Sequence, residues 1–117
     1  MIEFEEVNHV NVNLIDSEYK IVQSQADLDR FYRTINENNP SPRKSPIPSF
    51  NNDERYIVLQ PKIGQTDFTV EEVSENGENL KIKIQQYDNP EFKNLKYPAS
   101  IIKIANKRNY KIVQLIK

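Results

Sequence analysis

The sequence predicts an α+β domain that is mostly β, with an antiparallel sheet or small sandwich of six to seven strands and one helix near residues 25–37. Two observations lead to this prediction. Short runs in which Ile, Val, Leu, Phe or Tyr alternate with polar residues fill most of the chain, as in half-buried strands, and only one window has helical spacing. The 117 residues contain no linker and no internal repeat, so we expect residues 1–117 to form a single β-rich domain.

Two strands are predicted before the helix. Alternating apolar side chains favour a strand over about residues 7–15. The alternation slips around Glu6 and Val7, which indicates a β-bulge or a later start of the strand. After a polar turn, residues 19–23 have the composition of a second short strand.

The helix is predicted to begin at Ser24. The Ser24 hydroxyl can accept a hydrogen bond from the backbone N–H of Asp27, whose carboxylate favours the positive end of a helix. Four apolar residues then recur at the spacing i, i+3, i+4 and i+7, which places them on one face. They are Leu28, Phe31, Tyr32 and Ile35. The helix should end by Asn38-Asn39, because Pro40 disfavours helical backbone in the residue before it.

A loop of unusual composition is predicted between residues 39 and 53. Its four prolines fix φ and remove amide donors, so extended, polyproline-like backbone is expected, with Ile47 and Phe50 holding its far end to the core. A rigid, exposed loop can bind a protein partner at low cost in conformational entropy, although a passive connection explains the composition equally well. The candidate protein-binding residues are Pro40, Pro42, Arg43, Lys44, Pro46, Ile47, Pro48 and Phe50.

Residues 55–87 are predicted to form the centre of the sheet. The continuous apolar run at residues 56–59 is typical of a strand that is buried on both faces. Alternating residues at 67–73 and 80–84 predict two more strands. The dipeptide Asn76-Gly77 between them favours a type I′ hairpin turn, because both central residues of such a turn need positive φ.

Two further strands are predicted over residues 100–104 and 110–116, after a polar loop at residues 88–96. The last strand carries apolar residues in both registers. This pattern favours an inner position, where both faces of the strand are covered.

Composition argues against several classes of function. Basic and acidic residues are interspersed and the formal net charge is −1, so the basic field that nucleic-acid binding requires is missing. A chain without cysteine forms no disulfide or thiolate metal site. No apolar run is long enough to span a membrane, and the first residues lack the basic start and apolar stretch of a signal peptide.

The sequence carries no catalytic or cofactor-binding motif. His9 is the only histidine, and it falls on the outward register of the first strand, where a plain surface residue is the simpler interpretation. Two groups have the residue types of nuclease metal sites, but a chain rich in Glu and Lys produces such groups by chance. They are Asp16 with Glu18 and Lys20, and Asp88 with Glu91 and Lys93. We therefore expect no enzyme activity, no catalytic residue, no metal and no cofactor.

Five segments follow one another in an order that has a known counterpart. They are Ile21-Val-Gln-Ser24, Asp27-Leu28 with Phe31-Tyr32, Pro48-Ser-Phe50, Tyr56-Ile-Val-Leu-Gln60 with Gly64, and Phe68-Thr-Val70. This succession of strand, short helix, proline-containing loop, apolar strand and hairpin resembles the C-terminal domain of the protease complex subunit PrcB family. The resemblance covers roughly residues 19–117.

The resemblance implies a non-catalytic protein-binding module, an accessory or inhibitory subunit of a bacterial protease. It also implies a secreted or periplasmic lipoprotein whose leader precedes the sequence, whereas a cytoplasmic location follows if Met1 is the native start. The alternative function is that of a small immunity or antidote protein that binds and neutralises a toxin, because such proteins are often soluble, single-domain and slightly acidic. In both cases the expected partner is another protein.

Overall fold

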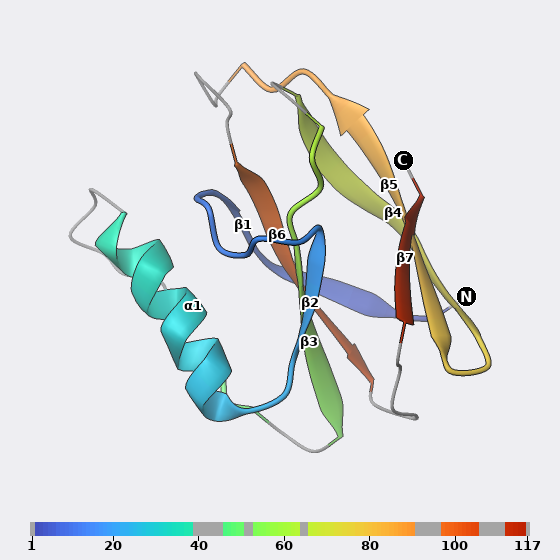
Figure 1. Ribbon diagram of the computed structural model, residues 1–117, viewed down its shortest axis with the longest axis horizontal. Coiled ribbons are helices and arrows are strands. Elements are labelled where there is room, and N and C mark those ends of the chain that lie inside the picture. Colours follow the sequence, from blue (N-terminus) through green and yellow to red (C-terminus); the bar gives the residue numbers. More distant parts are fainter. Residues whose placement is uncertain are drawn as a thin grey trace.

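The computed structural model describes residues 2–38, 46–50, 53–63, 66–90, 97–105 and 112–116 (Figure 1). Its elements are, in chain order, β1 (Phe4–Asn11), β2 (Tyr19–Val22), α1 (Gln25–Glu37), β3 (Glu54–Leu59), β4 (Asp67–Asn76), β5 (Asn79–Tyr87), β6 (Pro98–Ala105) and β7 (Ile112–Ile116). The predicted class is confirmed, because the described residues form a mostly β fold with one helix. No helix in the described part of the chain has the length and apolar character needed to cross a membrane.

The strands form two sheets. One contains four strands in the order β1-β6-β3-β2, and the other contains three in the order β4-β5-β7. The sheets are joined at one margin, where the backbone N–H of Ile2 donates to the carbonyl of Val73 over 2.7 Å. The helix α1 lies beside the four-stranded sheet, on the side away from β7 (Figure 1). The molecule therefore has three layers: a helix, a four-stranded sheet and a three-stranded sheet.

β3 lies between two hydrophobic cores. Ile57 and Leu59 belong to the core between the two sheets, whereas Tyr56 and Val58 belong to the core beneath α1. All four side chains are buried, which confirms the prediction of a strand covered on both faces. The helix contributes the predicted apolar face to its core, namely Leu28, Phe31, Tyr32 and Ile35.

The signals predicted at the ends of α1 are confirmed. Ser24 is the N-cap, and its hydroxyl accepts a hydrogen bond from the backbone N–H of Asp27 over 3.2 Å. The helix ends at Asn38, whose backbone N–H caps the last turn. The N-cap hydrogen bond satisfies an amide that would otherwise lack a partner within the helix.

Two predictions about strand arrangement are wrong. Residues 55–87 do not form the centre of one sheet, because β3 belongs to one sheet and the β4–β5 hairpin to the other. β7 lies at an edge, and it pairs with β5 in parallel rather than antiparallel. β7 follows β6, which belongs to the other sheet, so no hairpin fixes its direction relative to β5. Its edge position leaves Ile116 40% exposed.

The turn between β4 and β5 is displaced by one residue from the prediction. Asn76 pairs with Asn79, so Gly77 and Glu78 form the turn rather than Asn76 and Gly77. Gly77 has φ +64°, a left-handed conformation that glycine adopts without steric cost. The first position of the turn is therefore the one that requires glycine.

The β-bulge in β1 is confirmed, and it decides which way the side chains of this strand face. The register with β6 shifts between Glu6 and Asn8, so Val7 is the extra residue. In a regular strand, side chains three positions apart, such as Glu6 and His9, face opposite sides of the sheet. The extra residue reverses the alternation, so Glu6 and His9 lie on the same face.

Candidate functional site

The candidate protein-binding loop is described only in its second half. Pro46, Ile47, Pro48 and Phe50 are described, whereas Pro40, Pro42, Arg43 and Lys44 lie outside the described residues. Gln25, in the first turn of α1, holds this half through both ends of its side-chain amide. Its Nε2 donates to the carbonyl of Pro48 over 3.1 Å, and its Oε1 accepts from the backbone N–H of Phe50 over 2.7 Å. The segment is therefore fixed to the helix.

Phe50 and Ile47 differ in how they are placed. Phe50 packs against the core beneath α1, as predicted, and the Arg55 guanidinium lies 5.5 Å from its ring centroid. Ile47 was expected to hold the loop to the core as well, but its side chain is 46% exposed. Gln25 and Phe50 already anchor the segment, so its attachment does not need Ile47.

Ile47 and the outer side of α1 together enclose a shallow hollow of about 620 Å³. We call its lining the Ile47 surface, and it comprises Asp29, Arg33, Asn36, Glu37 and Ile47. An exposed apolar side chain surrounded by charged and amide groups is the arrangement found at the centre and rim of protein interfaces.

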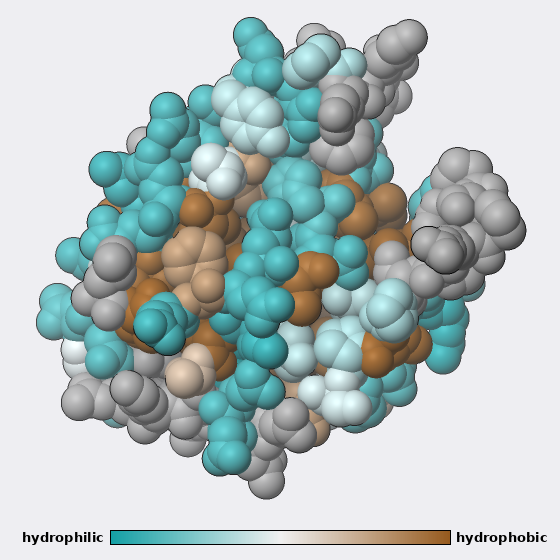
Figure 2. Space-filling view, turned by 180° about the vertical axis from the view of Figure 1, so that it is seen from behind, coloured by the Kyte–Doolittle hydropathy of each residue, from teal (hydrophilic) through white to brown (hydrophobic). Residues whose placement is uncertain are grey.

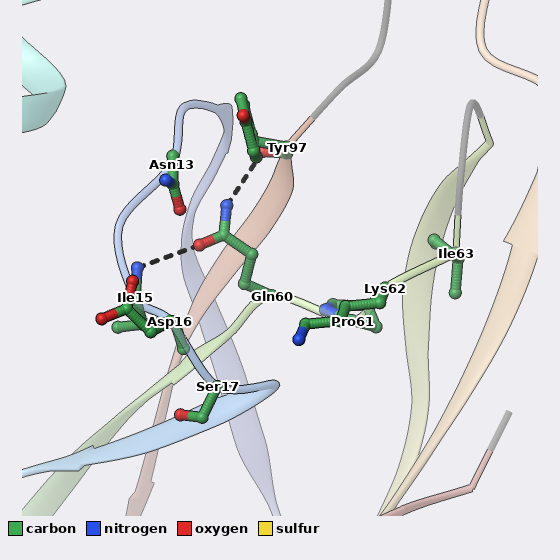
Figure 3. A pocket seen from close by; sticks show the side chains of 9 residues that line it. All are labelled: Asn13, Ile15, Asp16, Ser17, Gln60, Pro61, Lys62, Ile63 and Tyr97. Atoms are coloured by element: carbon green, nitrogen blue, oxygen red, sulfur yellow. Dashed lines mark hydrogen bonds between the residues drawn. The ribbon is translucent and has the colours of Figure 1, made fainter.

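A second hollow, of about 430 Å³, lies beside Gln60 (Figure 3). Its lining comprises Asn13, Ile15, Asp16, Ser17, Gln60, Pro61, Lys62, Ile63 and Tyr97. The Gln60 side chain is buried, and its Oε1 accepts from the backbone N–H groups of Leu14 and Ile15 over 2.9 and 3.0 Å. Its Nε2 donates to the carbonyls of Val12 and Tyr97 over 2.8 and 3.4 Å. Gln60 therefore fixes the walls of the hollow and has no remaining amide group to offer a ligand.

A group of polar residues between the two sheets was not predicted as a unit. We call it the His9 network, and it comprises Glu6, His9, Asp67, Tyr87, Asn89 and Ser100. His9 Nε2 lies 2.6 Å from Asp67 Oδ1, and His9 Nδ1 lies 3.2 Å from Glu6 Oε2. The prediction of a plain surface histidine is wrong, since the His9 side chain is only 17% exposed and Asp67 is fully buried. The bulge at Val7 is the physical reason, because it turns His9 towards β4.

The contacts favour the charged form of the titratable groups in the network. Both ring nitrogens of His9 face carboxylate oxygens, so both can donate to a carboxylate when the ring is protonated. Burial alone would lower the pKa of His9, but the hydrogen bonds to Glu6 and Asp67 outweigh it and raise that pKa above its ordinary value. The hydrogen bond from His9 lowers the pKa of Glu6 despite partial burial.

Asp67 is ionised although it is buried. Burial would raise the pKa of Asp67, but hydrogen bonds from Asn89, His9 and the backbone N–H of Phe68 lower it below its ordinary value. The Asn89 amide donates over 2.8 Å and the Tyr87 hydroxyl over 3.3 Å. Asp67 is thus one buried charge surrounded by donors.

The network does not have the geometry of a hydrolase triad. Ser100 is fully buried, and its hydroxyl donates to Glu6 Oε2 over 2.6 Å rather than to His9. A nucleophile needs a path to substrate as well as a base, and the fully buried Ser100 side chain has no such path. The arrangement instead joins β1 and β6 of one sheet to β4 of the other by charged hydrogen bonds.

Of the two acidic-lysine groups, only Asp16 with Glu18 and Lys20 lies wholly within the described residues. No cluster of three or more His, Cys, Asp or Glu side chains suited to a metal occurs within residues 2–38, 46–50, 53–63, 66–90, 97–105 and 112–116. The Glu18 carboxylate accepts a hydrogen bond from the backbone N–H of Lys62 over 3.1 Å. Glu91 and Lys93 lie outside the described residues.

The face seen from behind is mixed in hydropathy. Figure 2 shows apolar areas in more than one place, separated by a polar band. Hydropathy alone therefore singles out no interface on this face, and the exposure of individual apolar side chains is more informative. Among the described residues, the large apolar side chains that are most exposed are Ile47, Tyr87, Tyr97 and Ile116.

Comparisons with known proteins returned no significant match to a protein-family model, a curated protein or a solved structure.

Proposed function

We propose that this protein is a non-catalytic protein-binding module that contacts its partner through the Ile47 surface. The observation that carries the proposal is the attachment of Pro48 and Phe50 to Gln25, which leaves Ile47 46% exposed between two prolines. A pre-ordered apolar side chain loses little conformational entropy when a partner covers it.

The chemistry of the Ile47 surface fits a protein better than a small molecule. Its hollow is open and shallow, and its walls carry both signs of charge, on Asp29, Arg33 and Glu37. Small-molecule sites are usually concave clefts that enclose most of the ligand, which an open and shallow hollow does not do. Interfaces with a folded protein or a peptide commonly combine an apolar anchor with a charged rim.

The resemblance to the PrcB family supports a protease as the partner, with this chain as its accessory or inhibitory subunit. A toxin is the alternative partner, and the chain would then be an immunity or antidote protein. The identity of a captured partner distinguishes the two functions.

A crosslinking capture experiment in cells of the source organism tests the proposal. The tagged wild type should recover a discrete protein, and Ile47→Asp should reduce its recovery at least tenfold. Burying an exposed Ile side chain contributes about 1.5–3 kcal/mol, or roughly ten- to a hundredfold in affinity.

Ile116→Asp is the matched control, because Ile116 is the same residue type at 40% exposure and lies on β7. It should recover the partner as the wild type does. Circular dichroism and thermal unfolding of both variants establish that they fold. Equal recovery by Ile47→Asp and the wild type would exclude the Ile47 surface as the contact.

A further inference from the structure

The outer edge of β2 carries backbone groups that point away from the sheet. β2 lies at the end of the four-stranded sheet, with β3 as its neighbour. The backbone N–H of Gln60 donates to the carbonyl of Glu18 over 2.9 Å, so these two residues form a hydrogen-bonded pair. Hydrogen-bonded pairs alternate along antiparallel strands. The next such pairs towards the helix therefore involve Lys20 and Val22.

It follows that Tyr19 and Ile21 direct their N–H and C=O groups away from β3. An independent contact agrees with this direction, because the Ser17 hydroxyl donates to the carbonyl of Tyr19 over 2.7 Å. The N–H of Tyr19 and both backbone groups of Ile21 face outward from the sheet. Such groups are the pairing surface for an added strand.

A hollow of about 500 Å³ runs along this edge. Its lining comprises Ser17, Tyr19, Lys20, Ile21, Gln23 and Asp27. Ser17 also lines the hollow beside Gln60, and it is labelled in Figure 3. An extended chain that pairs with β2 would lie about 4.8 Å from it, which places that chain in this space.

The side chains of β2 define the chemistry of the added strand. Lys20 is exposed, and its ammonium lies 5.8 Å from the Phe31 ring centroid. No ion pair of Lys20 is found among the described residues, while nearby Asp27 is paired with Arg30 over 3.3 Å. On the other face, Tyr19 and Ile21 pack against the core between the sheets. A matching strand therefore needs an acidic side chain opposite Lys20, with apolar side chains on both sides of it.

We propose that the outer edge of β2 binds an extended peptide with an apolar–acidic–apolar sequence, which adds to the four-stranded sheet as a fifth strand. The acidic residue stands opposite Lys20 in a non-hydrogen-bonded pair, in which side chains approach most closely. This site is separate from the Ile47 surface and does not depend on it. The competing interpretation is that Lys20 protects the edge from pairing, as lysines on edge strands often do.

Backbone-amide NMR with two blocked peptides tests the proposal. One peptide has the sequence Thr-Val-Glu-Val-Thr, and the control has Lys in place of Glu. Adding the Glu peptide at millimolar concentration should shift the amide signals of Tyr19 and Ile21 and slow their hydrogen exchange. The amides of Lys20 and Val22 already pair with β3 and should change much less. The Glu peptide should bind about three- to tenfold more tightly than the Lys peptide.

Two variants separate edge pairing from general electrostatic attraction. Lys20→Glu should reverse the preference, so that the Lys peptide binds more tightly. Ile21→Pro removes one outward N–H and no hydrogen bond to β3, so it should abolish binding of both peptides while the amide spectrum of the other sheet stays unchanged. If Ile21→Pro does not fold, the reversal by Lys20→Glu remains the test.

Three outcomes would overturn the proposal. The first is no shift at Tyr19 and Ile21 with either peptide, which would identify Lys20 as an edge-protecting residue. The second is equal affinity for the Glu peptide and the Lys peptide, both in the wild type and in Lys20→Glu. The third is a dimer that forms as the protein concentration rises and in which the β2 amides exchange more slowly without any peptide. Such a dimer would show that a second copy of the chain occupies the edge.

Discussion

At the scale of single residues, the His9 network joins the two sheets through buried charge. His9 and Asp67 are 58 positions apart in the sequence and lie 2.6 Å from each other in the fold. Removing one partner of a buried ion pair leaves the other charge without compensation, which is more costly than removing both. The stability of this protein should therefore depend on His9 more strongly than its position near the surface suggests.

His9→Leu should lower the free energy of unfolding by about 2–4 kcal/mol, because Asp67 stays buried without its opposite charge. Adding Asp67→Asn to the same chain should restore part of this loss. Urea denaturation of the wild type, the two single variants and the double variant gives the coupling energy. Strictly additive effects would show that the two side chains do not interact.

The same network predicts a pH dependence of stability. The pKa of His9 is raised in the fold, so its contribution is present below its ordinary value of about 6.5 and is lost as the pH rises through the folded pKa. The pKa values of Glu6 and Asp67 are lowered, so their contribution is present above about pH 4 and is lost on acidification. The stability difference between the wild type and His9→Leu should be largest between about pH 5 and 6.5. A constant difference from pH 4 to 9 would contradict this assignment.

Gln60 offers a second prediction at this scale. Gln60→Leu should destabilise the fold by about 2–4 kcal/mol, since two backbone N–H groups and two carbonyls lose their partner. Gln60→Glu keeps the acceptor for Leu14 and Ile15 and should retain more stability at a pH where its carboxyl is protonated. The O–H can then donate to the carbonyl of Val12, whereas an ionised carboxylate would face the carbonyls of Val12 and Tyr97 without a hydrogen to donate. Thermal unfolding ranks the two variants, and equal melting temperatures would mean that the contacts to Leu14 and Ile15 contribute nothing.

At the scale of elements, the sequence predicts what depends on local periodicity and capping. The helix from Gln25 to Glu37 and the double burial of β3 follow directly from spacing. The pairing of β7 does not follow from spacing, because it depends on a crossover between the sheets. The inward position of His9 does not follow from spacing either, because it depends on the Val7 bulge. The slip in alternation at Val7 was visible in the sequence. Its consequence for His9 required the position of β4.

The β4–β5 turn gives the prediction at this scale. Gly77→Ala should cost about 1–2 kcal/mol, because the left-handed φ of +64° strains an L-residue even though no atom lies within 4 Å of the added methyl group. Gly77→Asn should cost less, since Asn tolerates this conformation better. Chemical denaturation measures both. Gly77→Ala without any loss would show that the turn adopts another conformation in solution.

At the scale of the whole molecule, the three layers divide the candidate binding surfaces from the part that holds the fold together. α1 and the Pro46–Phe50 segment lie on one side of the four-stranded sheet, and the three-stranded sheet lies on the other. The His9 network lies between the sheets and stabilises the contact between them. A partner that binds through the Ile47 surface can therefore approach without disturbing the core between the sheets.

Part of the candidate site could be predicted from sequence. The prolines indicated a rigid exposed loop, because prolines restrict the backbone wherever they occur. The exposure of Ile47 was not predicted, since this side chain was expected to hold the loop to the core. The role of Gln25 could not be predicted, since its contacts with Pro48 and Phe50 span 23 and 25 positions of the chain. Nothing in local periodicity encodes such a contact.

Hydrogen exchange of the protein alone and in complex with its captured partner shows whether the partner covers the Ile47 surface. We expect slower exchange in α1 and at residues 46–50 on binding, with little change in β4 and β5. Slower exchange confined to β4, β5 and β7, with α1 unchanged, would contradict a function based on the Ile47 surface.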